Sequence, residues 1–255
     1  MTAKPLSTYD QNGFYCEMLG LPVTAQAKLP ELWERLLSYD AEELEARASE
    51  ATGELLDLGI TFTVYSERDA IDRILPFDII PRVLSAADWQ HIEKGVIQRV
   101  TALNLLLEDL YSDQKILKDG VIPRELVVGN ANFRADLIGY RPPCGTFVHV
   151  AGVDLIRDDK GRFLVLEDNA RTPSGVSYVV ENRHLMQRAF PDLLAGFSVR
   201  SVSEYGVRLL GKLCEVARRG GGDPTVGLRS RGGGSAGSLA RVWLGRGGGR
   251  GGGGG

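Results

Sequence analysis

The sequence predicts an α/β or α+β fold with an N-terminal helical region, a long central helix and a mixed sheet. Apolar residues recur at helical spacing over residues 30–58 and again, after an intervening segment, over residues 86–111. From residue 121 onward, short apolar runs such as 126–128 alternate with turn residues, as in strand-rich sequences. The 255 residues are 43% hydrophobic and 25% charged, which is ordinary for a globular protein.

The N-terminal part is predicted to contain two helices and a first strand. Pro30 suits the first turn of a helix, and leucines follow it at helical spacing. Residues 41–58 continue this pattern until Gly59, and the β-branched and aromatic residues of 60–65 indicate a strand. The prolines within residues 75–81 indicate an extended segment.

The central helix is predicted over residues 86–111. Ser85 is a good N-cap for it, and Asp88 is well placed near the positive end of the helix dipole. We expect its apolar face to pack in the core. That face consists of Trp89, Ile92, Val96, Val100, Leu103, Leu107 and Leu110.

Two apolar runs in the second half of the chain are predicted to form a β-hairpin. They cover residues 147–156 and 163–167, and the Asp and Gly residues of 157–161 between them suit a tight turn. Helices are predicted over 177–190 and 202–218.

Composition excludes several classes of protein. A net charge of −3 does not suit a chain that coats nucleic acid or an anionic membrane. The three cysteines are far apart and offer neither a zinc spacing nor a disulfide framework, so we expect free thiols. The start has no signal-peptide pattern, and no run approaches the ~20 apolar residues of a membrane span. The sequence therefore predicts a cytoplasmic location.

Residues 220–255 differ from the domain predicted over residues 1–219. Glycine supplies 17 of these 36 residues, and five arginines against one acid make the segment positive by 4. Such a composition buries little apolar surface, so we predict disorder from about residue 220. Two explanations stay open: an RNA-binding Arg/Gly tail, or a frameshift near codon 226 of a GC-rich reading frame. Translation of the other two frames distinguishes them.

Three oxygen-bearing side chains are predicted to converge on the hairpin. Pairing across the turn brings Asp154 opposite Glu167, and the two-residue period of a strand places Asn169 on the same face as Glu167. Two carboxylates and an amide are hard oxygen ligands that suit Mg²⁺. Asp168 is expected to face the other side. The alternative is that Asp154 and Glu167 form surface ion pairs with Arg157 and Arg171.

These residues also carry a resemblance to a known family. The segments Gly152-Val-Asp-Leu-Ile-Arg-Asp158 and Val165-Leu-Glu-Asp-Asn-Ala-Arg-Thr-Pro-Ser-Gly-Val-Ser-Tyr178 resemble the signature of the circularly permuted ATP-grasp proteins. The resemblance covers about residues 8–226 and extends to the ligase domain of glutathionylspermidine synthase. It implies a partial ATP-grasp-like fold in which Asp154, Glu167 and Asn169 on a hairpin bind magnesium.

The resemblance implies ATP- and Mg²⁺-dependent amide-bond synthesis from a small-molecule or peptide carboxylate and an amine, through an acyl phosphate. Arg171 is then the candidate catalytic residue, steadying a phosphate or the carboxylate. Thr172, Ser174 and Gly175 are candidate cofactor-binding residues in a small loop held by Pro173.

The chain also departs from the family pattern. The resemblance fades at residues 223–226, where a further strand of the family would begin, and no lysine follows Lys212 to grip phosphate. We therefore expect a truncated or frameshifted ligase that is inactive or nearly so, with an exposed sheet edge. The alternatives are a non-catalytic scaffold or interaction protein and, through the tail, an RNA-binding protein.

Overall fold

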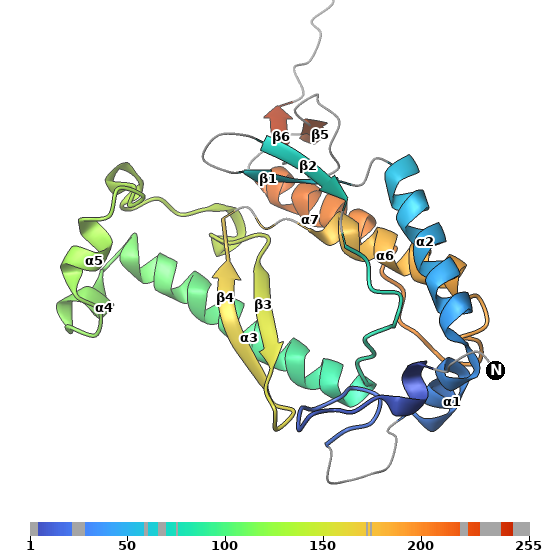
Figure 1. The fold of residues 1–255 in the computed structure, drawn as a ribbon. Helices are drawn as coiled ribbons and strands as arrows, with labels where there is room; N and C mark the ends of the chain where they lie inside the picture. The colour runs from blue at the N-terminus through green and yellow to red at the C-terminus, as the bar shows by residue number, and fades with distance from the viewer. Residues whose placement is uncertain are drawn as a thin grey trace, which may run out of the picture.

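In a computed structural model, the fold combines several helices, of which the one in the middle of the chain is the longest, with strands in separate pairs (Figure 1). The described residues are 5–21, 29–58, 61–65, 70–74, 76–171, 173, 175–219, 224–229 and 241–246. The combination of helices and strands predicted from the sequence is confirmed.

The N-terminal helices form as predicted. Helix α1 spans Pro30–Ser38 and α2 spans Ala41–Asp57. Helix α2 begins with a reciprocal capping box, in which the Asp40 carboxylate accepts from the Glu43 amide and the Glu43 carboxylate accepts from the Asp40 amide. This arrangement pairs two backbone N–H groups at the helix start.

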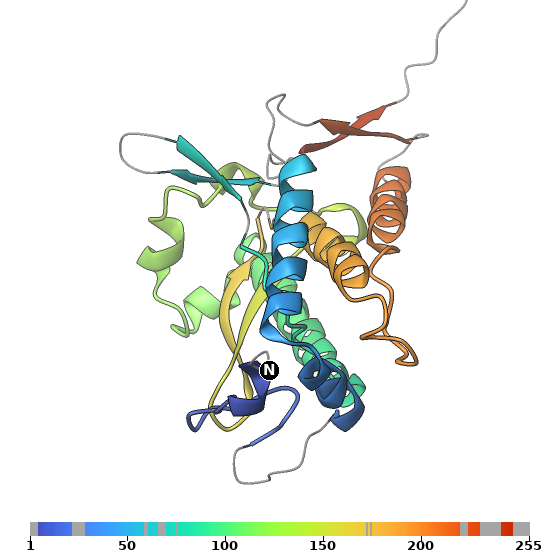
Figure 2. The same ribbon diagram turned by 45° about the vertical axis from the view of Figure 1, so that its right-hand side comes forward.

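The main core lies where α1 and α2 meet α6, which spans Val176–Ala189 (Figure 2). Arg35 holds the segment after α6, because its Nη1 donates to the carbonyl oxygens of Asp192, Leu193 and Ala195 at 2.6–3.0 Å. Among the residues whose burial is described, the fully buried side chains are Leu32, Leu36, Leu55, Leu185, Phe190 and Leu193.

The central helix α3 spans Ala86–Leu110, and the Ser85 hydroxyl caps it by accepting from the Asp88 amide at 3.1 Å. Its predicted apolar face is only half covered. Ile92 and Leu110 are buried, whereas Trp89 is 42% exposed. The cause is geometric: a two-stranded ribbon covers less of a helix than a wider sheet does.

The sheet is not mixed in the described part of the chain; the expectation of one mixed sheet is wrong there. Three separate antiparallel pairs occur instead. They join β1 (Thr61–Tyr65) to β2 (Ala70–Ile74), β3 (Gly152–Arg157) to β4 (Phe163–Asn169), and β5 (Pro224–Arg229) to β6 (Arg241–Arg246). Each pair joins two consecutive strands and has no third strand beside it, so every described strand keeps one unpaired edge.

The segment between α3 and the hairpin contains short helices, α4 (Lys115–Lys118) and α5 (Arg124–Val128), and two 3-10 turns (Ala135–Leu137 and Pro143–Gly145). The apolar run 126–128 therefore belongs to a helix. Figure 1 shows α4 and α5 at the far end of α3 from the N-terminal segment.

The C-terminal part contains α7 (Tyr205–Arg219) and the β5–β6 pair, which contacts α7 through β5. Paired strands are described at 224–229 and 241–246, within the segment expected to be disordered, and the disorder of residues 220–255 stays a prediction. The rest of the tail lies outside the described residues. The apolar face of α7 is open, with Val207 75% exposed.

Candidate metal centre

The turn of the β3–β4 hairpin is built by Asp158 and Gly161, as the sequence predicts. The Asp158 carboxylate accepts from the backbone amides of Lys160 at 3.1 Å and Arg162 at 2.7 Å. Gly161 takes a positive φ of 78°. These contacts close the turn and hold the pKa of Asp158 below its ordinary value, with the Arg162 backbone amide as the main cause.

The strand register confirms the predicted opposition of Asp154 and Glu167. Asn169 pairs with Gly152 at the open end of the hairpin. A β-bulge interrupts the ladder beside Asp154, where Leu155 pairs with Val165 and Leu166 is the extra residue. The bulge absorbs Leu166, so Glu167 and Asn169 share the face of Asp154 and Asp168 takes the opposite face.

Asp154, Glu167 and Asn169 converge on one point of the exposed face. The Asn169 Nδ2 donates to Glu167 Oε1 at 3.0 Å and lies 3.5 Å from Asp154 Oδ2. One amide nitrogen thus contacts both carboxylates, which is a position that a cation can take. Turning the amide over would present its oxygen to that cation. We call these three residues the carboxylate–amide cluster; its donor set fits Mg²⁺.

The third metal ligand of the cluster would have to be the amide of Asn169. No group of three or more His, Cys, Asp or Glu residues that could hold a metal occurs in the described ranges. All three members are exposed, so water can complete an octahedral shell. A site of this kind keeps positions open for water and phosphate.

The ion-pair alternative for these carboxylates is not found. Arg157 is 5% exposed and turns to the other face, where Nη2 lies 3.1 Å from Asp88 Oδ1 and Nη1 lies 3.9 Å from Glu17 Oε1. Its guanidinium is stacked between the rings of Tyr15 and Phe163, 3.9 Å and 4.3 Å from their centroids. Arg157 therefore joins the hairpin to α3 and to the N-terminal segment.

A second ion pair joins the hairpin to α3 at Asp168. Arg99 Nε donates to both carboxylate oxygens at 2.7 Å and 2.8 Å, and Nη2 lies 2.7 Å from Oδ2. The Arg99 hydrogen bonds hold the pKa of Asp168 below its ordinary value. Strand alternation predicted that Asp168 faces the opposite side of the strand from Glu167 and Asn169, but nothing in the sequence pattern identified Arg99 as its partner.

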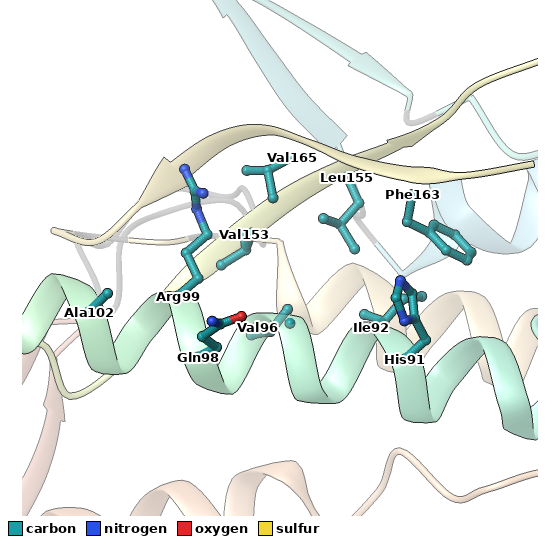
Figure 3. A pocket seen from close by; sticks show the side chains of 11 residues that line it. His91, Ile92, Val96, Gln98, Arg99, Ala102, Val153, Leu155, Phe163 and Val165 are labelled. Carbon is teal, nitrogen blue, oxygen red and sulfur yellow. The ribbon is translucent and has the colours of Figure 1, made fainter.

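A groove of about 390 Å³ lies between α3 and the inner face of the hairpin (Figure 3). Val153, Leu155, Phe163 and Val165 line it from the strands. Arg99 lines it from the helix, beside Ile92 and Val96. The interface is thus mainly apolar and incompletely filled.

The loop after β4 is described only in part. Arg171 is exposed and makes no ion pair with another described residue. Thr172 and Ser174 lie outside the described residues. Pro173 is close to the cluster, because a Cβ added to Gly152 would lie 3.0 Å from Pro173 Cβ and 3.7 Å from Asn169 Cβ. Gly175 has φ +96° and precedes α6.

With this geometry in view, comparison with known proteins identifies the family. A family model described as a circularly permuted ATP-grasp matches residues 81–249. This chain belongs to the circularly permuted ATP-grasp family, which confirms the resemblance seen in the sequence. The match includes the hairpin and extends into the glycine-rich tail.

Several relatives accompany this match. An uncharacterized protein of Mycobacterium leprae is 45% identical over 210 residues, which are 82% of this chain and 37% of that protein. An uncharacterized protein of Synechocystis is 40% identical over 212 residues, which are 83% of this chain and 44% of that protein. A Frankia alni protein named "Putative glutamate–cysteine ligase 2-3" is 39% identical over 154 residues, 60% of this chain and 17% of that protein.

The chain thus spans less than half the length of these relatives, between 17% and 44%. Separately, none of the helices in the described residues is long and apolar enough to cross a membrane.

Proposed function

We propose that the β3–β4 hairpin is the metal-binding part of an ATP-dependent carboxylate–amine ligase. The observation that supports this most directly is the meeting of Asp154, Glu167 and Asn169 at one exposed point. Two adjacent carboxylates repel each other unless a cation or hydrogen bonds compensate them. Mg²⁺ would neutralise this negative charge, and it prefers oxygen donors of the kind that these side chains offer.

In the proposed reaction, a carboxylate oxygen of the substrate attacks the γ-phosphorus of ATP, and ADP leaves. The amine then attacks the acyl phosphate, and inorganic phosphate leaves as the amide bond forms. Bound Mg²⁺ would neutralise charge on the phosphate oxygens and orient them. Asp154, Glu167 and Asn169 would hold the Mg²⁺ ion at the open end of the hairpin, and their exposure leaves room for the nucleotide.

The loop that follows the cluster is proposed to contact the substrates. Arg171 stands two residues beyond Asn169 and has no described ion-pair partner, so its guanidinium is available for a phosphate or carboxylate. Thr172, Ser174 and Gly175 would approach the nucleotide with backbone and hydroxyl groups. The closeness of Pro173 to Gly152 supports a place for this described residue of the loop beside the cluster.

The substrates are proposed to be amino-acid or peptide carboxylates and amines. The name of the Frankia alni relative refers to the joining of glutamate and cysteine, which is a reaction of this class. We further propose that this chain alone turns over slowly or not at all, because no lysine follows Lys212 to hold the phosphates.

The proposal is tested by calorimetric titration of the full chain with Mg²⁺ and a non-hydrolysable ATP analogue. Glu167→Gln is the decisive variant, because it keeps the shape and the acceptor for Asn169 while removing one charge. We expect its affinity to fall about tenfold, since ligand charge sets the affinity of such sites.

Asp159→Asn is the matched control. Asp159 is an exposed carboxylate in the turn of the same hairpin, at the opposite end from the cluster, so its loss should leave binding unchanged. Equal binding by the wild type and Glu167→Gln would refute the metal site. No binding by any form would favour the non-catalytic scaffold instead.

A further inference from the structure

We propose that Arg99 is a positioning residue for the carboxylate–amide cluster, acting through Asp168. This inference rests on the proposed metal site. Arg99 contacts none of Asp154, Glu167 and Asn169 in the described structure; its partner is the residue between two of them. Its role would be to set where β4 lies against α3, and thereby where the two neighbouring side chains point.

The geometry of the pair is well suited to that role. Both carboxylate oxygens of Asp168 accept from Arg99 Nε at 2.7 Å and 2.8 Å, and Nη2 lies 2.7 Å from Oδ2. Such a fork restrains direction as well as distance, which a single contact does not. Because successive side chains of a strand point to opposite faces, fixing Asp168 inward directs Glu167 and Asn169 outward.

A second anchor makes the arrangement specific. Near the start of α3, Asp88 binds Arg157 of β3, whereas three turns later Arg99 binds Asp168 of β4. The two pairs have opposite polarity. Sliding the hairpin along the helix would separate both pairs and bring like charges toward each other, so the charges select one register.

The spacing of the anchors agrees between helix and hairpin. Asp88 and Arg99 are eleven residues apart, or about 16 Å along a helix. Arg157 and Val153, which pairs with Asp168, are four residues apart, or about 13 Å along a strand. The long side chains of the two arginines span the difference.

Apolar packing alone restrains this interface poorly. The groove of about 390 Å³ between α3 and the hairpin leaves the inner face incompletely filled. The hairpin also has no further strand beside it in the described part of the chain. Figure 3 shows the Arg99 side chain reaching from α3 toward the strands. The end that carries the cluster would therefore depend on Arg99.

The experiment measures Mn²⁺ binding to the full chain by electron spin resonance of the free ion. Arg99→Ala and Asp168→Asn are expected to weaken binding about tenfold, the typical effect of losing a group that orients metal ligands. Arg99→Lys should recover part of that loss, because it retains the charge but not the fork. If the single variants do not fold, Mn²⁺ binding is measured instead on the double variant Arg99→Asp with Asp168→Arg, in which the two charges are exchanged.

Arg134→Ala is the matched control. Arg134 forms an equally close fork with Asp136, at 2.7 Å and 3.0 Å, outside the hairpin. Its loss should leave Mn²⁺ affinity unchanged. If Arg99→Ala binds Mn²⁺ as tightly as Arg134→Ala does, the positioning role is refuted.

A measurement without metal separates this inference from the metal site itself. The NMR signals of the Asn169 side-chain amide report its contacts with Glu167 and Asp154. They should move in Arg99→Ala and stay in place in Arg134→Ala. If the wild type binds no Mn²⁺ but the Asn169 signals move in Arg99→Ala, only the proposed function is refuted. If the signals do not move in Arg99→Ala, the positioning role is refuted.

Discussion

Replacement of Gly161 by alanine tests how the hairpin turn is held against the N-terminal segment. Gly161 has φ +78°, and a Cβ added there would lie 2.7 Å from Cδ2 and 2.8 Å from Cε2 of Tyr15. The ring of Tyr15 stacks on Arg157, which is the anchor of β3 on α3. The new methyl group must therefore displace either the ring or the turn.

Two costs contribute to the expected loss of stability. The left-handed backbone conformation costs an alanine about 1 kcal/mol relative to glycine. Displacement of the ring weakens a desolvated cation–π contact worth about 1–2 kcal/mol. We expect the free energy of unfolding to fall by about 2–3 kcal/mol, which lowers the melting midpoint by about 5–10 °C for a chain of this size.

Gly120→Ala separates the two costs. Gly120 has a similar φ of +70°, but a Cβ added there meets nothing within 4 Å. This variant should lose only about 1 kcal/mol in urea-induced unfolding. In a Tyr15→Ala background, Gly161→Ala should cost no more than Gly120→Ala. Equal losses for both glycines in the wild-type background would show that the ring does not occupy the position described.

Three further predictions concern other contacts. The pKa of Asp109 is lowered by hydrogen bonds from the backbone amides of Ile116 and then Lys115, so its stabilisation is present above its ordinary pKa of 3.8 and is lost as the pH falls through the lower folded value. Asp109→Asn should therefore destabilise the protein in urea at pH 7 more than at pH 3, and a pH-independent difference would contradict this cause. Gly152→Ala should push Pro173 outward, because the two Cβ atoms would be 3.0 Å apart, and weaken Mn²⁺ binding more than Gly53→Ala, where nothing lies within 4 Å. Leu36→Ala removes a fully buried side chain and should lower the free energy of unfolding by about 2–5 kcal/mol in calorimetric melting, whereas Leu56→Ala, at a 51% exposed site, should cost much less.

Much of the local structure was predictable from the sequence. Ser85 and the apolar spacing after it predicted α3, and Asp158 with Gly161 predicted the hairpin turn. The opposition of Asp154 and Glu167 followed from that turn. These features depend on residues close together in the chain, so caps, turns and periodicity were sufficient to predict them.

The arrangement of the strands was not predictable in the same way. Apolar alternation identifies strands but not their partners, so a mixed sheet was expected where separate antiparallel pairs occur. The bulge at Leu166 was also missed, because one extra residue leaves the apolar pattern almost unchanged.

The sequence by itself indicated the family, the main helices and the three residues that are proposed to bind a metal. Only the tertiary structure decided which side chains join the hairpin to α3. Arg99 and Asp168 are 69 residues apart, as are Asp88 and Arg157. Pairing over such separations depends on how helix and hairpin pack in space, and local patterns in the chain do not encode it.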